Sequence, residues 1–152
     1  MTISLVTFSI KPGRVPDCRT SLRNAPTAPG LVAFRFVEIG VVNTIIAFCD
    51  AGDERAISLW ARDRVADMRE AAPLRGVSVD FYEGALPAGL ADAPAVLLER
   101  PLSVGDLVPL SGEVGRGLWL QPSESLDAAL AAAIALRRTS SAETALLIPE
   151  HL

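Results

Sequence analysis

The pattern of apolar and polar positions centres on one stretch, Gly30 to Asp50 (GLVAFRFVEIGVVNTIIAFCD). It contains two runs rich in β-branched and aromatic residues, and a short Gly-Val-Val-Asn link separates them. Such a pattern is typical of two antiparallel strands joined by a short loop. We predict the strands at Leu31–Ile39 and Thr44–Cys49. This hairpin is the central element of the predicted fold.

Further elements lie on either side of the hairpin. Alternating apolar residues predict outer strands at Ile3–Ile10 and Gly76–Glu83. Apolar residues at helical spacing predict helices at Val15–Ala25 and from Asp50 to about Ala71. The order β-α-β-β-α-β over residues 3–84 defines a ferredoxin-like unit, an α+β fold in which four antiparallel strands carry both helices on one face. The opposite face of the sheet then needs another cover.

A second group of elements follows a linker rich in proline, glycine and alanine. We therefore divide the chain into a ferredoxin-like domain at 1–86, a linker at 87–94 and a C-terminal extension at 95–152. The extension is predicted to contain strands at Ala95–Glu99, Leu118–Gln121 and Ala145–Pro149, a loop at Pro101–Gly117 and a helix capped by Ser125. It is either a second, eroded ferredoxin-like half whose first helix has become a loop, or an appendage that covers the open sheet face or exchanges with a partner chain.

Each of the three predicted helices has an apolar stripe that should face the sheet. The stripe of the first helix consists of Val15, Cys18, Leu22 and Ala25. The stripe of the second helix consists of Ile57, Trp60, Ala61, Val65 and Met68. That of the helix after Ser125 consists of Leu126, Ala129, Leu130, Ala133 and Ile134.

Composition narrows the class of protein. The 152 residues have a formal net charge of −4 and no cluster of basic residues, so the electrostatic pattern of a nucleic-acid-binding protein is missing. No apolar run approaches the ~20 residues of a membrane-spanning helix, so no membrane partner is expected. Because 50% of the residues are hydrophobic, we expect more apolar surface than one chain covers, and therefore a homodimer.

The few cysteines and histidines limit the chemistry. Cys18 and Cys49 have no metal-type spacing, and the first ten residues alternate like a strand rather than forming a signal peptide, so we expect reduced thiols in a cytoplasmic protein. His151 is the single histidine, which argues against a metal centre built from several histidines and favours a tail residue over a catalyst. No phosphate-binding glycine pattern is present, and we predict no cofactor. One lysine against thirteen arginines indicates a GC-rich bacterial genome.

Residues 3–84 resemble the NIPSNAP-like proteins of the dimeric α+β barrel superfamily. The resemblance rests on a first strand followed by Lys11–Gly13, on the stretch Glu38–Asn43 (EIGVVN), and on a following apolar strand and a helix that bears Trp60. It implies that the open sheet face pairs with a second unit and encloses a barrel, dimeric or pseudo-dimeric. It also implies a cavity for a hydrophobic, often aromatic or polyketide-like, molecule.

Members of that superfamily include cofactor-independent monooxygenases, cyclases, isomerases and haem-degrading enzymes. Haem degradation does not fit this chain, because no histidine lies on the predicted barrel unit to serve as the axial ligand. NIPSNAP-like members mostly lack an assigned reaction.

Three residues are candidates for catalysis. Asp80 and Tyr82 lie two residues apart on one strand, so their side chains share a face. If that face lines a cavity, the carboxylate can accept a proton beside a carbonyl group; otherwise the pair is a solvated Asp and a Tyr at a dimer seam. Arg35 lies in an otherwise apolar strand, so its guanidinium needs a carboxylate such as that of Glu38 or Asp80, or the oxygen of a ligand.

Seven further residues are candidates for substrate binding: Thr7, Ser9, Glu38, Asn43, Ser78, Trp60 and Trp119. The hydroxyls of Thr7, Ser9 and Ser78 share the predicted face of Asp80. Glu38 and Asn43 flank the hairpin turn, where Asn also serves local hydrogen bonding. Both tryptophans also fit a role in core packing.

The leading hypothesis is a cofactor-independent enzyme that acts on a hydrophobic carbonyl-bearing or aromatic small molecule. Asp80 would accept a proton while Tyr82 and Arg35 stabilise an oxygen, in a cyclisation, isomerisation or oxygenation. The alternative is a non-catalytic dimeric module that binds a ligand or a protein. The two differ in whether Asp80 must be partly buried beside an empty volume.

Overall fold

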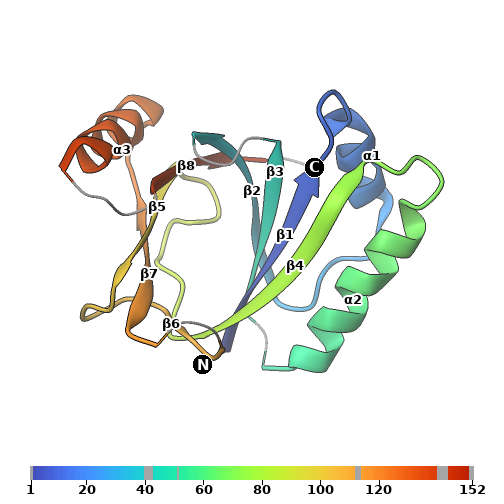
Figure 1. Cartoon of the computed structure of the whole chain (residues 1–152), viewed down its shortest axis with the longest axis horizontal. Helices are drawn as coiled ribbons and strands as arrows, with labels where there is room; N and C mark the ends of the chain where they lie inside the picture. Colours follow the sequence, from blue (N-terminus) through green and yellow to red (C-terminus); the bar gives the residue numbers. More distant parts are fainter. Residues whose placement is uncertain (1, 40–42, 51, 112–113, 140–143, 151–152) are drawn as a thin grey trace.

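One eight-stranded antiparallel sheet and three helices make up the structure. The computed structural model describes residues 2–39, 43–50, 52–111, 114–139 and 144–150. The sheet has the strand order β6-β4-β1-β3-β2-β8-β5-β7 and curves into a barrel (Figure 1). No helix in the described parts of the chain is long and apolar enough to cross a membrane.

The first half of the chain forms the ferredoxin-like unit that the sequence predicts. Its elements are β1 (Thr2–Ile10), α1 (Val15–Asn24), β2 (Leu31–Ile39), β3 (Thr44–Asp50), α2 (Glu54–Asp67) and β4 (Leu74–Glu83). The four strands lie in the order β4-β1-β3-β2, and both helices cover one face of them (Figure 1). The Asp53 side chain caps α2 by accepting a hydrogen bond from the Ala56 N–H at 3.1 Å.

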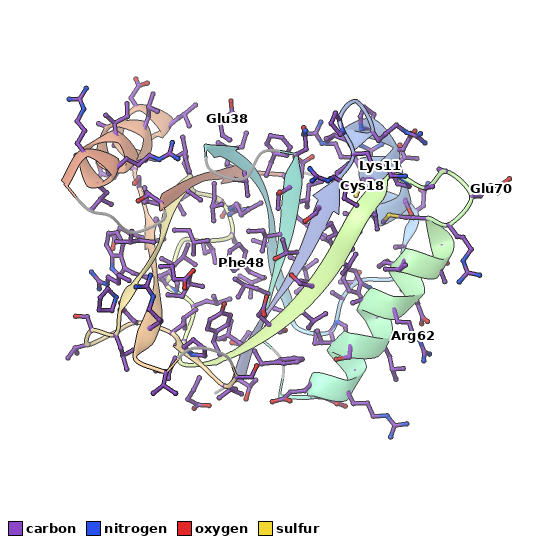
Figure 2. The ribbon with its side chains drawn as sticks, viewed as in Figure 1. Lys11, Cys18, Glu38, Phe48, Arg62 and Glu70 are labelled. Atoms are coloured by element: carbon purple, nitrogen blue, oxygen red, sulfur yellow. The ribbon has the colours of Figure 1, made fainter. Side chains whose placement is uncertain are left out.

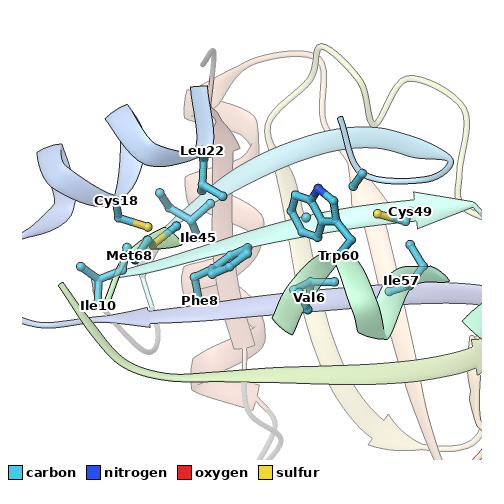
Figure 3. Close-up of a cluster of buried hydrophobic side chains, with 13 residues drawn as sticks. Val6, Phe8, Ile10, Cys18, Leu22, Ile45, Cys49, Ile57, Trp60 and Met68 are labelled. Atoms are coloured by element: carbon cyan, nitrogen blue, oxygen red, sulfur yellow. The ribbon is translucent and has the colours of Figure 1, made fainter. Parts of the chain in front are cut away.

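A core between these helices and the sheet holds the first half together. Val6, Phe8 and Ile10 from β1 face Ile57 and Trp60 from α2 (Figure 3). The rings of Phe8 and Trp60 meet edge to face, with 6.0 Å between their centroids. The prediction that Ile57 and Trp60 face the sheet is confirmed.

The second half repeats the strand order of the first half with one helix fewer. Its elements are β5 (Ala95–Pro101), β6 (Val108–Pro109), β7 (Arg116–Pro122), α3 (Leu126–Thr139) and β8 (Thr144–Pro149). The strands lie in the order β8-β5-β7, and a bridge between Leu107 and Leu118 connects β7 to β6. The order β8-β5-β7-β6 corresponds to β4-β1-β3-β2, with a loop in the place of α1.

The two halves close a barrel within a single chain. On one side β2 pairs with β8, for example Phe36 opposite Ile148, and on the other β4 pairs with β6, with Tyr82 opposite Pro109. Reciprocal backbone hydrogen bonds of 2.9 and 3.0 Å between Leu107 and Leu118 complete the circuit. The predicted α+β barrel is therefore confirmed in its pseudo-dimeric form. The division at 1–86, 87–94 and 95–152 stays a prediction.

A salt-bridged turn replaces the missing helix of the second half. The Arg100 guanidinium donates to both oxygens of the Asp106 carboxylate, at 3.0 and 2.7 Å, and the Ser103 N–H donates to the same carboxylate at 3.0 Å. These charge-assisted bonds hold the pKa of Asp106 below its ordinary value. The Arg100 guanidinium also lies over the Trp119 ring. The turn is thus fixed without a helix.

The interior of the barrel is an apolar core to which the linker contributes. Leu90 is only 1% exposed and packs with Leu86 among Ile3, Phe48, Leu118 and other apolar residues from both halves. Phe48 points from β3 into this interior (Figure 2). Leu90 of the linker and Leu86 just before it therefore occupy space in which the sequence predicted a cavity.

The largest difference from the predicted pattern lies in which side chains the helices bury. Helix α2 ends at Asp67 rather than near Ala71, and its Arg64 is buried while Val65 is exposed. Arg64 stacks on Trp60 and pairs with Asp67 at 2.9 Å, so its charge is compensated at the edge of the core.

In α3 only the alanines of the predicted stripe are buried. Ala129 and Ala133 are fully buried, whereas Leu126, Leu130 and Ile134 are exposed. The side that faces β5 and β8 carries small residues, so the leucines and the isoleucine turn away from the sheet.

The packing of the linker generates a stability prediction. The substitution Leu90→Ala should lower the free energy of unfolding by about 2–5 kcal/mol, because it removes buried methyl groups from the barrel core. Leu59→Ala, at an exposed leucine on α2, should change it by less than about 0.5 kcal/mol. Urea denaturation of both variants measures the difference, and equal small losses would show that the linker does not stabilise the barrel.

Candidate functional site

Arg35 is a fully buried cation with an incomplete set of partners. It is 1% exposed, and its Nη1 donates a hydrogen bond of 2.6 Å to the carbonyl oxygen of Phe34. Its Nε and Nη2 have no hydrogen-bond partner among the described residues. Burial lowers the pKa of Arg35, and the charge of Asp92 acts in the opposite direction. An unpaired buried N–H is costly, so the site favours an acceptor.

A pocket of about 370 Å³ lies beside Arg35. The end of α1, the segment that follows it, the start of β2, the linker and the end of β8 provide its walls. The lining residues are Leu22, Arg23, Ala25, Pro26, Thr27, Leu31, Val32, Ala33, Phe34, Arg35, Ala91 and Glu150. Most of these side chains are apolar, and two of the three charged ones are arginines.

The carboxylate in this pocket is already paired. Glu150 forms an ion pair with Arg19 of α1, with an Nε–Oε1 distance of 2.6 Å and an Nη2–Oε2 distance of 2.9 Å. The Arg19 guanidinium also lies 5.3 Å from the centre of the Phe36 ring. This pair ties the end of β8 to α1 and leaves the pocket with an excess of positive charge from Arg23 and Arg35.

Tyr82 and Asp80 belong to a different region of the barrel. Tyr82 lines a pocket of about 150 Å³ together with Glu99, Arg116 and four other residues. Burial raises the pKa of Tyr82 to about 12, and the charges of Asp80 and Glu99 add to that effect. Glu99 is in turn 3.6 Å from the Arg116 guanidinium. The phenol therefore keeps its proton and can donate a hydrogen bond at neutral pH.

Asp80 is exposed, and the short strand β6 is the reason. β6 pairs only with Tyr82 and Glu83 of β4, so the residues of β4 before them lack a strand on that side in the described region. Asp80 contributes to the electrostatics of Tyr82, but the structure does not bury it beside either pocket.

The three predicted catalytic residues do not share one site. Arg35 lines the larger pocket and Tyr82 the smaller, and neither Glu38 nor Asp80 forms the predicted ion pair with Arg35 among the residues described. Across the strands from β2 to β4, Arg35 is paired with Ile46, Ile46 with Thr7, and Thr7 with Ser78. Two residues therefore lie between Arg35 and Ser78 on the inner face of the sheet. The three residues that the sequence predicted to act together therefore do not line one common pocket.

The predicted face of the small hydroxyl residues is confirmed. Thr7 lies opposite Ser78, and Leu5 opposite Asp80, on the side of the sheet away from the helices. Thr7 and Ser9 are half-buried, and Ser78 is exposed. None of the three lines either of the two pockets described above.

The remaining candidates line neither of the two pockets described above. Glu38 is exposed at the end of β2 (Figure 2). Asn43 has a positive φ of 55°, and its carbonyl oxygen accepts a hydrogen bond from the Ile10 N–H at 2.8 Å, as a turn residue does. Residues 40–42 of the hairpin link and His151 lie outside the described residues.

Both tryptophans pack on the outer, helix-covered side of the barrel wall. The Trp60 Nε1 donates to the carbonyl oxygen of Pro26 at 2.8 Å, and Trp119 packs against the cluster under α3. Core packing, the simpler of the two interpretations of these residues, is what the structure shows.

Sequence reasoning missed the groups that surround Arg35 and Tyr82. Asp92, Glu99 and Glu150 come from the linker and the second half, and only the pairing of the halves brings them to these places. Cys18 and Cys49 are free and buried, and burial raises the pKa of both thiols. No group of three or more potential metal ligands occurs within the described ranges.

Comparisons with known proteins add information about the fold. No protein-family model matches the chain, and no curated protein matches it. Among solved structures, the chain is similar to the crystal structure of an uncharacterized NIPSNAP domain protein from Burkholderia xenovorans. The two share 17% identity with a TM-score of 0.42, over 59% of this chain and 97% of that one. This is a likeness of fold alone.

The environment of Tyr82 generates a prediction about pH. Tyr82 is the single tyrosine, so ultraviolet absorption reports on it alone, and we expect titration near pH 12 rather than at the ordinary pKa of 10.0. Because the folded state holds the proton more tightly, the stabilisation is complete below pH 10 and is lost as the pH rises toward 12. Asp80→Asn should lower the pKa. Titration of the native protein at its ordinary value would contradict the described burial of the phenol.

Proposed function

We propose that the chain binds a small apolar molecule that bears a carboxylate or another electron-rich oxygen, and that Arg35 holds this oxygen. The proposal rests on one observation: the buried Arg35 guanidinium lines a pocket, and its Nε and Nη2 have no hydrogen-bond partner in the part of the chain that the structure describes. This corresponds to the non-catalytic, ligand-binding alternative from the sequence, with Arg35 in its predicted role toward a ligand oxygen.

The energetics favour an occupant with negative charge. A buried polar group without a partner costs roughly 1–3 kcal/mol, and more when it is charged. A carboxylate can accept two parallel hydrogen bonds from a guanidinium, which removes that cost and adds charge-assisted bonds. The positive charge of Arg23 supports the same preference, since Glu150 is neutralised by Arg19.

The size and the lining of the pocket indicate the class of ligand. Small-molecule pockets typically measure about 300–1,000 Å³ and combine apolar walls with a few polar groups. The volume of about 370 Å³ lies at the lower end of that range. Leu22, Leu31, Val32 and Phe34 offer an apolar surface next to Arg35. A bicyclic aromatic carboxylate therefore suits the pocket better than a long acyl chain.

Calorimetry with two shape-matched probes tests the proposal. 2-Naphthoate should bind at least tenfold more tightly than 2-naphthamide, a difference of about 1.4 kcal/mol. Arg35→Met should abolish this preference and should also raise the free energy of unfolding, because it removes a buried charge that lacks a full set of partners. Arg62→Met, on the exposed side of α2 (Figure 2), should alter neither. Equal binding of both probes, or a preference that survives Arg35→Met, would contradict the proposal.

A second candidate function is the acid–base catalysis predicted from the sequence. The observation that favours it is Tyr82, which lines a pocket and keeps its proton because of burial and the nearby Asp80 and Glu99. In this scheme the Asp80 carboxylate, which is exposed and lines neither pocket, accepts a proton from the carbon beside a carbonyl group. The Tyr82 hydroxyl donates a hydrogen bond to the resulting enolate oxygen. Cyclisation, isomerisation and oxygenation of a carbonyl compound share this first step.

Deuterium exchange tests the catalytic candidate. The protein in D₂O should speed the loss of the C1 proton signal of 2-tetralone, observed by NMR, relative to buffer. Asp80→Asn and Tyr82→Phe should each reduce the added rate by roughly 10²-fold or more, the usual contribution of a positioned acid or base. Glu70→Gln should leave it unchanged. An exchange rate equal to that of buffer would count against catalysis.

The homodimer predicted from the sequence needs a surface outside the barrel seam. β8 and β6 of the same chain already pair with the edges of β2 and β4. We therefore propose that two chains, where they associate, do so through another face of the molecule.

A further inference from the structure

Exposed apolar side chains are concentrated in the second half of the chain. Among the described residues, eight of the eleven exposed large hydrophobic side chains lie after residue 100, and three of these eight lie on α3. The three are Leu126, Leu130 and Ile134, which are 50%, 36% and 41% exposed. Single exposed leucines are normal, but these are spaced at i, i+4 and i+8 and so form one ridge along the helix.

Helix α3 is apolar on all sides in its central part. Residues 128–136 (AALAAAIAL) contain no polar side chain. One side, with Ala129 and Ala133, is buried against Val96 and Leu146 of the sheet. Helices that are apolar on every side are normally covered on every side. By contrast, α2 has charged residues on its outer side, such as Arg62 and Asp63.

The charges at the two ends of α3 are complementary. Glu124 and Asp127 lie at its start, and Arg137 and Arg138 lie in its last turn, all of them exposed. If two copies of the helix pack antiparallel across a two-fold axis, the acidic end of each lies beside the basic end of the other. A parallel arrangement would place like charges together.

We infer that α3 pairs with α3 of a second copy of this chain, antiparallel, with Leu126, Leu130 and Ile134 in the seam. Ridges of residues four apart interlock in the common mode of helix packing. Helix α3 lies at the edge of the molecule, on the side away from α1 and α2, so a second copy reaches it without disturbing the barrel (Figure 1). The inference does not depend on what Arg35 binds.

The expected association is weak. A helix of 14 residues is about 21 Å long, and one such pair buries less than the ~800 Å² per partner of a standard interface. We therefore expect a dissociation constant in the micromolar range, with a dimer of twice the 16.1 kDa chain at high concentration.

Sedimentation equilibrium from 5 to 500 μM tests the inference. The native protein should shift from the monomer to the dimer mass with rising concentration, and Leu130→Glu should remain monomeric throughout. Leu59→Glu, which places the same charge at a leucine of similar exposure on α2, should dimerise like the native protein. A native protein that is monomeric at 500 μM would overturn the inference, and so would a dimer that Leu130→Glu leaves intact.

Charge reversal tests the antiparallel orientation. Reversing the basic end with Arg137→Glu and Arg138→Glu should weaken the dimer at least tenfold. Adding Glu124→Lys and Asp127→Lys should restore it, because opposite charges then face each other again. Dimerisation that is insensitive to these changes, or that is not restored, would contradict the antiparallel arrangement. Circular dichroism of each variant shows whether α3 is still helical.

Discussion

The second face of the four-stranded sheet in the first half is apolar, and the fold is stable only if this face is covered. Both helices of the first half lie on one side of β4-β1-β3-β2, and the other side carries Ile3, Leu5, Ile46 and Phe48. Exposing such a face would forfeit about 25 cal/mol for each Å² of apolar surface. The pairings of β2 with β8 and of β4 with β6 bring the strands of the second half over it. The barrel follows from that requirement.

The two halves that one chain joins differ in structure. The second half keeps the strand order but replaces its first helix with a turn that the Arg100–Asp106 ion pair holds in place. The linker, which two separate subunits would not need, places Leu90 in the interior, next to Leu86 at the end of the first half. As a result the interior is largely an apolar core. The polar groups suited to binding or reaction lie at its margins, around Arg35 and Tyr82.

The elements of the fold could be predicted because their signals are local. Alternation located β1, β4 and the β2–β3 hairpin, and it also placed Asp80 and Tyr82 on the inner face. The strand β6 could not be predicted, because two residues carry no periodic signal. The burial of α3 could not be predicted either: a stretch of alanine, leucine and isoleucine allows several faces, and close approach to the sheet selects Ala129 and Ala133.

The candidate site was only partly predictable, for a physical reason. The sequence shows that a buried Arg35 needs a partner, but the identity of the partner depends on groups far away in the chain. The structure provides one carbonyl oxygen, from Phe34, and assigns Glu150 to Arg19 instead. It also separates Arg35 from Asp80, which the strand pattern alone could not reveal. What remains is a strong donor beside a pocket that is lined by both apolar and charged side chains.

A crystal structure of the protein soaked with 2-naphthoate tests this account most directly. The account predicts that the carboxylate oxygens lie about 2.7–3.2 Å from the Arg35 Nε and Nη2, with the aromatic rings against Leu31, Val32 and Phe34. Naphthoate bound elsewhere, with these two nitrogens still unpaired or engaged by another part of the protein, would contradict it.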